Sequence, residues 1–364
     1  MIEKKNYFYG IDFLRWVAAL GVVLYHYTLH FQITEIKYNS FLNYLVLNRE
    51  FAPNFVWLFW AISGFVFTNI YIYRDVTLKK FFISRIARLY PLHFMTLILV
   101  TILQFISLIW FEITQENYSN DLYHFILHLF FASDWGFQNY WSFNTPIWSV
   151  SIEFPIYFLF FFTLIYLKKI KFLFPVFMII IFYYIFPQII ELFKTIKLID
   201  FNKWQSLAFF NFSSCIFYFF MGSFIYFCYS KFKKYSKLLL ISNLLSILFC
   251  LYLLNTSNES LRFIPATVIL FFSLILLAAI FDNFFYKFAK KMVFFGNTSY
   301  SIYLVHFPLQ LIFLLTCKKL FVDIRIFQNF WIFLIFIIIL QVISSISYKF
   351  FESPMRKIIN SKYS

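Results

Sequence analysis

The sequence predicts an all-α membrane protein, a helical bundle of about ten transmembrane helices with both termini in the cytoplasm. Of its 364 residues, 62% are hydrophobic and only 13% are charged, and the mean hydropathy is +0.77. Soluble domains carry about 25% charged residues, so this composition is typical of a polytopic membrane protein. Because no polar stretch is long enough for an independent soluble core, we expect a single membrane domain over residues 1–364.

Ten apolar segments are long enough to span about 30 Å of hydrocarbon as helices. They lie at 8–31, 54–73, 91–110, 147–167, 172–190, 207–229, 238–254, 263–280, 299–317 and 329–350. An eleventh apolar stretch, 122–132, is short and contains His124 and His128, which favours an interfacial or re-entrant segment.

The loop charges support this count, because cytoplasmic loops are enriched in Lys and Arg. With the N-terminus inside, 21 basic residues fall on the cytoplasmic side and nine on the other side. If 122–132 also spanned the membrane, the basic run 168–171 would lie outside, and Lys and Arg would no longer be enriched in the cytoplasmic loops. The net charge of +15 therefore indicates topology in the lipid bilayer, and we expect no nucleic-acid partner. We expect a multi-pass protein of a bacterial inner (cytoplasmic) membrane.

The first apolar segment contains three ionisable residues, Asp12, Arg15 and His26. A charge inside a bilayer costs about 2.5–3.5 kcal/mol, so such residues suggest a functional site. Eleven helical residues make three turns plus about 20°, which places Arg15 and His26 on one face about 16 Å apart. Asp12 lies close to that face. Either Arg15 reaches the interface and His26 hydrogen-bonds a neighbouring helix, or His26 is a buried acid or base and Arg15 binds an anion.

A second cluster contains Arg85 and Arg88, which are i, i+3 neighbours. We expect their short helix to end at Pro91, where the next span starts. The two arginines either anchor the chain against anionic lipid or form a forked pair that binds phosphates.

The third candidate is Glu153, about one turn into an otherwise apolar span. An intramembrane carboxylate needs a partner or a proton. Glu153 could accept a hydrogen bond from His26 and orient it, or titrate itself. The alternative is a glutamate near the positive end of its helix, exposed at the outer surface.

Other signals are weaker taken alone. Two further groups are typical of interfacial aromatic residues and of the end of the last membrane span. The first contains Tyr300, Tyr303 and His306, and the second contains Tyr348, Glu352, Pro354 and Arg356. The four cysteines have no CxxC spacing, and no carboxylate completes the His124/His128 pair, so neither a disulfide framework nor a metal site is expected. The motifs of soluble hydrolases, nucleotide-binding proteins and metalloproteases are absent.

In combination, these residues resemble the membrane acyltransferase-3 family, whose members move acyl groups from acyl-CoA onto carbohydrates and other acceptors. The matching features occur in the family's order and span nearly the whole chain. They are Arg15 and His26 preceded by Asp12, Arg85 and Arg88 with Pro91, Trp148-Ser149 with Glu153, Tyr303-Leu304 with His306 and Pro308, and Glu352-Ser353-Pro354-Met355-Arg356.

The resemblance implies an O-acyltransferase with acyl-CoA, most simply acetyl-CoA, as donor and no metal cofactor. The acceptor would be a hydroxyl of a cell-surface polysaccharide, another carbohydrate or a glycolipid. Arg15, Arg85 and Arg88 would hold the CoA phosphates, and His26 would act as base or transient acyl carrier, with Asp12 or Glu153 tuning the charges. Some family members carry a fused extracellular SGNH-type esterase domain. This sequence stops soon after its last span, so we expect direct transfer or a separate periplasmic partner.

A different class also fits part of the pattern. A proton-coupled secondary transporter, or a flippase for a glycan or lipid-linked substrate, could use Arg15, His26 and Glu153 as a proton relay. Such proteins commonly have spans broken by Gly or Pro, and this chain has only 6 Gly. A structural scaffold would not need buried ionisable groups.

Overall fold

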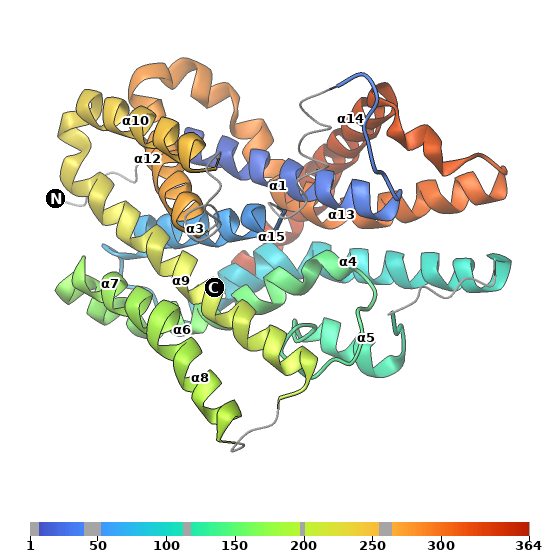
Figure 1. The fold of residues 1–364 in the computed structure, drawn as a ribbon, viewed down its shortest axis with the longest axis horizontal. Helices are drawn as coiled ribbons and strands as arrows, with labels where there is room; N and C mark the ends of the chain where they lie inside the picture. The colour runs from blue at the N-terminus through green and yellow to red at the C-terminus, as the bar shows by residue number, and fades with distance from the viewer. Residues whose placement is uncertain (1–6, 40–51, 112–117, 197–200, 255–263, 364) are drawn as a thin grey trace.

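The computed structural model describes residues 7–39, 52–111, 118–196, 201–254 and 264–363. Most of these residues are helical, and the only β-structure among them is isolated β-bridges. Figure 1 shows the arrangement of the helices. The α-helices are α1 (Tyr9–His30), α3 (Ala52–Tyr71), α4 (Leu78–Phe111), α5 (Leu122–Leu129), α6 (Trp148–Ile170), α7 (Leu173–Ile180), α8 (Phe186–Thr195), α9 (Lys203–Phe232), α10 (Ser236–Leu254), α12 (Ile264–Lys291), α13 (Val293–Lys319), α14 (Phe330–Ser347) and α15 (Ser353–Tyr363). Short 3₁₀ or π segments are η2 (Thr145–Ile147), η3 (Ile181–Ile185), η4 (Lys233–Tyr235), η5 (Ile324–Gln328) and η6 (Tyr348–Glu352).

Each of the ten predicted segments contains a helix, and the protein is an all-α polytopic membrane bundle. Within the described residues, eight helical stretches are long and apolar enough to cross a membrane. This number is lower than ten for two reasons. Helices α9 and α10 form one stretch, Lys203–Cys250, and α1, which carries the polar residues noted above, is not among the eight. Helix α5 has eight residues, which agrees with a segment too short to span.

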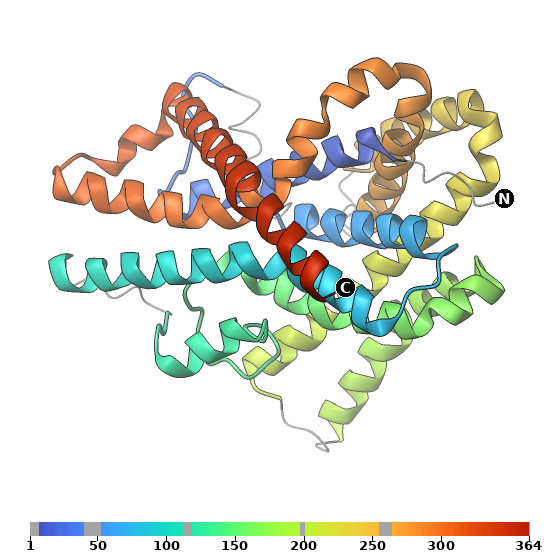
Figure 2. The ribbon, with the colours of Figure 1, turned by 180° about the vertical axis from the view of Figure 1, so that it is seen from behind.

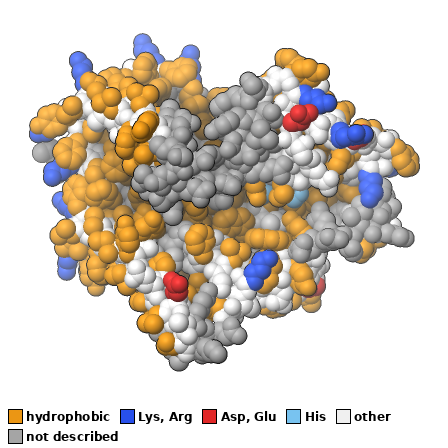
Figure 3. Space-filling model, in the orientation of Figure 1, with side chains coloured by type: hydrophobic (Ala, Val, Ile, Leu, Met, Phe, Trp, Pro, Cys, Tyr) orange, Lys and Arg blue, Asp and Glu red, His pale blue; other side chains and the backbone are white. Residues whose placement is uncertain are grey.

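Helices α1, α3, α4 and α13 run along the long axis through the middle of the molecule (Figure 1). Helices α14 and α15, joined by η6, form an oblique rod whose C-terminal part lies against α4 (Figure 2). Lys and Arg side chains gather along the edge where α10 lies and the chain begins (Figure 3). This clustering agrees with the charge asymmetry of the loops.

Helices α3 and α9 approach each other through glycines. A Cβ at Gly64 would lie 1.7 Å from the Phe219 carbonyl oxygen, and one at Gly222 would lie 1.8 Å from the Ala61 carbonyl oxygen. Small residues let helix backbones come this close, and close packing drives helix association in lipid. This contact positions α3, which forms one wall of the three cavities lined by Arg15 and Arg88.

The expected helix end at Pro91 is wrong. Helix α4 continues through Pro91, from Leu78 to Phe111. A proline removes one backbone hydrogen bond, but in membrane helices neighbouring groups and local adjustments compensate for the loss. Arg85 and Arg88 therefore belong to the same helix as the following span.

A buried carboxylate holds the loop between α5 and α6. Asp134 accepts hydrogen bonds from Gln138 Nε2 (2.9 Å) and Asn211 Nδ2 (2.7 Å), and its backbone N–H donates to Ser151 Oγ (3.2 Å). Burial raises the pKa of Asp134 to about 7. These bonds tie the loop to α6 and α9, and so position the first turns of α6.

We expect Gly64→Ala and Gly222→Ala to reduce the yield of folded protein, because each added Cβ meets a backbone oxygen that cannot move away. Overpacking of this kind costs about 1–3 kcal/mol. Gly21→Ala is the matched control, since its Cβ would meet the Phe55 ring, a side chain that can rotate. The measurement is the monodisperse fraction in detergent by fluorescence-detected size-exclusion chromatography. Equal yields for all three variants would contradict the expectation.

Stability should depend on pH through Asp134. Its folded-state pKa of about 7 exceeds the ordinary value of 3.8, so the folded chain binds more protons between these two pH values. The contribution of Asp134 to stability therefore falls as pH rises from about 4 to about 7. Asp134→Asn should remove this fall, and exposed Asp75→Asn should leave it in place. Thermal unfolding between these pH values tests this: a constant difference between wild type and Asp134→Asn would disprove it.

Candidate active site

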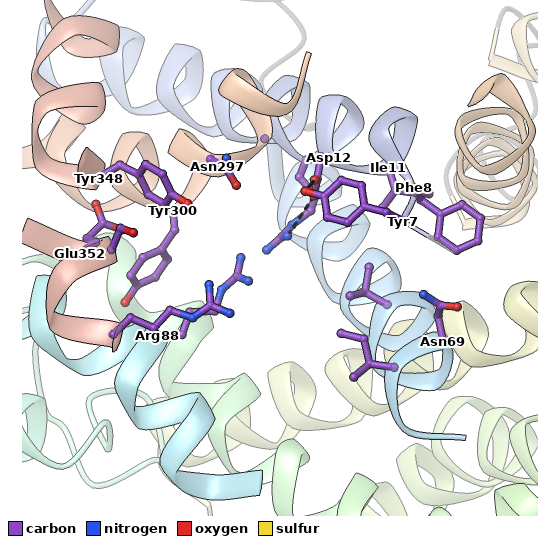
Figure 4. A pocket seen from close by; sticks show the side chains of 16 residues that line it. Tyr7, Phe8, Ile11, Asp12, Asn69, Arg88, Asn297, Tyr300, Tyr348 and Glu352 are labelled. Atoms are coloured by element: carbon purple, nitrogen blue, oxygen red, sulfur yellow. Dashed lines mark hydrogen bonds and ion pairs between the residues drawn. The ribbon is translucent and has the colours of Figure 1, made fainter. Parts of the chain in front are cut away.

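A polar chamber of about 270 Å³ lies at the N-terminal end of α1 (Figure 4). Its walls come from α1, α3, α4, α13 and the C-terminal segment. The lining residues are Tyr7, Phe8, Ile11, Asp12, Arg15, Val66, Asn69, Ile70, Arg88, Gly296, Asn297, Tyr300, Tyr348, Glu352, Ser353 and Arg356. Two smaller cavities, of about 70 and 60 Å³, share Arg15 and Arg88 with it. We call these three spaces together the arginine chamber.

Guanidinium groups dominate the arginine chamber. Arg15 pairs with Asp12 at 3.6 Å, and Asp12 also accepts a hydrogen bond from the Tyr7 hydroxyl. Arg88 lies across the chamber from Asp12 (Figure 4), and the described residues give it no ion-pair partner. Arg85 is buried, with its guanidinium 4.8 Å from the centre of the Phe67 ring. A cavity walled by such groups can bind phosphates, because guanidinium donors match phosphate oxygens.

The C-terminal motif also reaches this chamber. Arg356, in α15, lines two of its cavities, and Glu352, in η6, accepts hydrogen bonds from the hydroxyls of Ser301 and Ser347. The sequence alone suggested only a C-terminal stop for this motif. Its side chains reach the chamber because α15 folds back against α4, which local sequence patterns do not reveal.

Glu153 is buried, so its interpretation as an exposed residue at the outer surface is wrong. It lines the smallest cavity of the arginine chamber together with Arg15 and Arg88. Ser63 and Tyr157 are its hydrogen-bonding neighbours. One of its carboxylate oxygens, Oε1, has no hydrogen-bond partner among the described residues. A ligand in the cavity could therefore bond this oxygen.

His26 meets a second histidine rather than a carboxylate. His26 Nδ1 lies 3.2 Å from His306 Nε2 and 3.1 Å from the Val22 carbonyl oxygen. His306 Nδ1 in turn lies 3.2 Å from the Ile302 carbonyl oxygen. Carbonyl oxygens only accept, so the tautomer that satisfies both of them has the proton on both Nδ1 atoms, and in it His306 Nε2 accepts from His26. In this tautomer the basic lone pair of His26 is on Nε2. We call these two residues the histidine pair.

A polar network on α6 and α13 lies beside the histidine pair. The Tyr303 hydroxyl lies 2.5 Å from Ser149 Oγ and donates to the Pro146 carbonyl oxygen at 2.7 Å. Tyr303 also lines the smallest cavity of the arginine chamber, and its ring centre lies 6.2 Å from that of His306. Tyr303 therefore borders the arginine chamber on one side and contacts the histidine pair through its ring on the other.

The structure brings together some of the predicted residues and separates others. Arg15, Arg85, Arg88, Asp12 and Glu153 all line the arginine chamber. His26 lies farther along α1, eleven helical steps and about 16 Å from Arg15. Among the described residues its recorded hydrogen-bond partners do not include Glu153 or Asp12.

The sequence carries a local signal for His306. It is a histidine within an apolar segment, three residues after Tyr303, so both lie on nearby faces of one helix. Both are buried. The spacing of Tyr303 and His306 in an apolar segment indicates a polar helix face. It does not identify His26 as the residue that His306 contacts.

The chain belongs to the acyltransferase family: the family's sequence profile, described as an acyltransferase domain, matches residues 8–349. Proteins of Staphylococcus aureus strains COL and MSSA476, which carry the name putative O-acetyltransferase, are 25% identical over 394 aligned residues, covering 98% of this chain and 58% of each relative. The peptidoglycan O-acetyltransferase OatA of Listeria monocytogenes is 27% identical over 184 residues, 46% of this chain and 26% of OatA. The chain thus spans little more than half the length of the S. aureus relatives. No solved structure matches it.

Proposed function

We propose that the chain is a multi-pass O-acyltransferase of the bacterial inner membrane, which transfers an acetyl group from acetyl-CoA to a hydroxyl of a carbohydrate. One observation carries the proposal: the arginine chamber and the histidine pair lie along the same helix, α1, and Tyr303 lines the chamber while its ring contacts that of His306. The family membership and the names of the relatives support the reaction class.

The arginine chamber suits the nucleotide end of CoA, which carries the phosphates. Arg88, Arg15 and Arg85 would bind phosphate oxygens, and Asp12 would hold the Arg15 guanidinium in place through its ion pair. The thin pantetheine arm would follow the polar network, and its thioester would reach the histidine pair. The separation of about 16 Å between Arg15 and His26 is compatible with such an arm.

The histidine pair supplies a general base. His26 Nε2 would take the proton of the acceptor hydroxyl as its oxygen attacks the thioester carbonyl carbon. When the C–S bond breaks, the same proton would pass to the CoA sulfur, so that an ester and free CoA result. His306 would keep the His26 ring oriented and accept part of its charge through the hydrogen bond to Nδ1. Glu153 would balance the charge of Arg15 and Arg88 while the phosphates are absent.

His26→Ala should abolish acetyl transfer while leaving donor binding largely intact, because it removes the base and spares the arginine chamber. The measurement is the alkali-labile O-acetyl content of the surface polysaccharide in cells with wild type, the variant or no protein. Loss of a general base lowers turnover by about 10²–10⁴-fold. His124→Ala, a histidine in α5 outside the pair, is the matched control.

Two results would count against the proposal. Normal acetylation with a well-expressed His26→Ala variant would remove His26 from the mechanism. If wild-type membranes acetylate no polysaccharide and cleave no labelled acetyl-CoA, the chain is not an acetyltransferase, and the transporter interpretation replaces it.

Arg88→Gln should raise the KM for acetyl-CoA, since a hydrogen bond to a charged group contributes about 1.5–3 kcal/mol, or about 10–100-fold in binding. The KM for acetyl-pantetheine, which lacks the nucleotide phosphates, should stay unchanged. Arg74→Gln, an exposed arginine that lines none of the described cavities, is the control. Cleavage of the two labelled thioesters by purified protein gives both constants. An equal rise for both donors would show that Arg88 does not bind the phosphates.

A further inference from the structure

A second large cavity, of about 720 Å³, lies at the other end of α1. We call it the outer cavity. Its polar lining includes His30, Gln32, Thr101, Gln104, Tyr118 and Asn120. Leucine, phenylalanine, valine and isoleucine side chains complete the walls, and the described lining contains one basic residue, Lys318, and no Asp or Glu. Ligand pockets are typically about 300–1,000 Å³, so a small saccharide unit would fit.

The outer cavity differs chemically from the arginine chamber. Amide and hydroxyl groups both donate and accept hydrogen bonds, and this dual capacity matches a sugar hydroxyl, which also does both. Guanidinium groups only donate and select anions. The outer cavity therefore favours an uncharged, hydroxyl-rich ligand.

A buried amide lies on α13, one helical turn beyond the histidine pair in the direction of the residues that line the outer cavity. Gln310 is fully buried, and neither its side-chain oxygen nor its nitrogen has a hydrogen-bond partner among the described residues. Leaving such a group unsatisfied costs about 1–3 kcal/mol. Gln310 is four residues beyond His306, so it lies one turn farther along the same face of α13. The next residue, Leu311, lines the outer cavity.

Helix α1 also carries a polar side chain between the outer cavity and the histidine pair. His30 is one turn beyond His26, lines the outer cavity, and has its ring centre 6.0 Å from that of His26. Its ring also contacts Phe307 of α13, with centres 5.0 Å apart. Polar groups of α1 and α13 therefore lead from the outer cavity to the histidine pair.

We infer that the outer cavity is the acceptor site, that it takes an uncharged saccharide, and that Gln310 hydrogen-bonds the acceptor beside the attacking hydroxyl. This rests on the proposed function, since it names the place and the chemical class of the second substrate. The acceptor would approach from the outer cavity and the donor from the arginine chamber, so that the two meet at His26. The side-chain amide of Gln310 makes its hydrogen bonds when the acceptor is bound.

The first test replaces the amide. Gln310→Leu should lower the rate of acetyl transfer at least about tenfold and leave the KM for acetyl-CoA unchanged. Gln310→Asn keeps an amide and should recover part of the rate. Gln188→Leu, an exposed glutamine of α8, is the matched control. The probe is envelope polysaccharide stripped of O-acetyl groups by mild alkali and offered to proteoliposomes with labelled acetyl-CoA.

The second test fills the cavity. Thr101→Trp places a bulky ring in the wall and should also lower transfer at an unchanged KM for acetyl-CoA. Ile102→Trp, at the next position of α4, is 52% exposed and lines none of the described cavities, so it should behave as wild type. Full transfer by Thr101→Trp would contradict the assignment of this cavity to the acceptor.

The outcomes separate this inference from the function on which it rests. If both Gln310→Leu and Thr101→Trp transfer acetyl groups at the wild-type rate, the outer cavity is not the acceptor site. The proposed acetyltransferase function would be unaffected by that result. If wild type cleaves no acetyl-CoA and acetylates nothing, both proposals are wrong. Equal losses in Gln310→Leu and Gln310→Asn, with normal folding by size-exclusion chromatography, would assign Gln310 to packing alone.

Discussion

The site depends on the parallel packing of α1 against α13. At one end of this contact Gly296 lies against Asp12, and a Cβ at position 296 would come 2.3 Å from the Asp12 Cβ. Farther along the same two helices, His306 meets His26. Because both helices continue without interruption between these points, the approach at Gly296 and the histidine contact are set together. Neither the arginine chamber nor the histidine pair exists without this contact.

The bilayer explains why the buried polar groups of the site are mostly paired. Without water, each buried polar atom needs a partner inside the protein. Tyr303 hydrogen-bonds Ser149 and the Pro146 carbonyl, and Glu352 accepts hydrogen bonds from two serine hydroxyls. Glu153 Oε1 and the Gln310 amide are among the described exceptions. They lie on either side of the histidine pair, at the positions where we propose that the donor and the acceptor bind.

The two ends of α1 therefore differ in chemistry. One end faces guanidinium groups and the other faces amides, hydroxyls and aromatic rings. A transfer across the bundle needs such a division, because a polyanionic donor and a neutral acceptor require different binding groups. The histidine pair lies between them, buried from water, so a thioester held there would be shielded from hydrolysis.

The sequence by itself determined the helical class, the ten helical segments, the shortness of α5, and the alignment of Arg15 with His26 along one helix. Length, hydropathy and the helical repeat are local properties, so local residues suffice to predict them. Only the tertiary structure decided that His26 pairs with His306, that Glu153 faces the arginines, and that α4 continues through Pro91. These depend on which helices become neighbours, and in lipid that choice follows from side-chain packing between segments far apart in the chain.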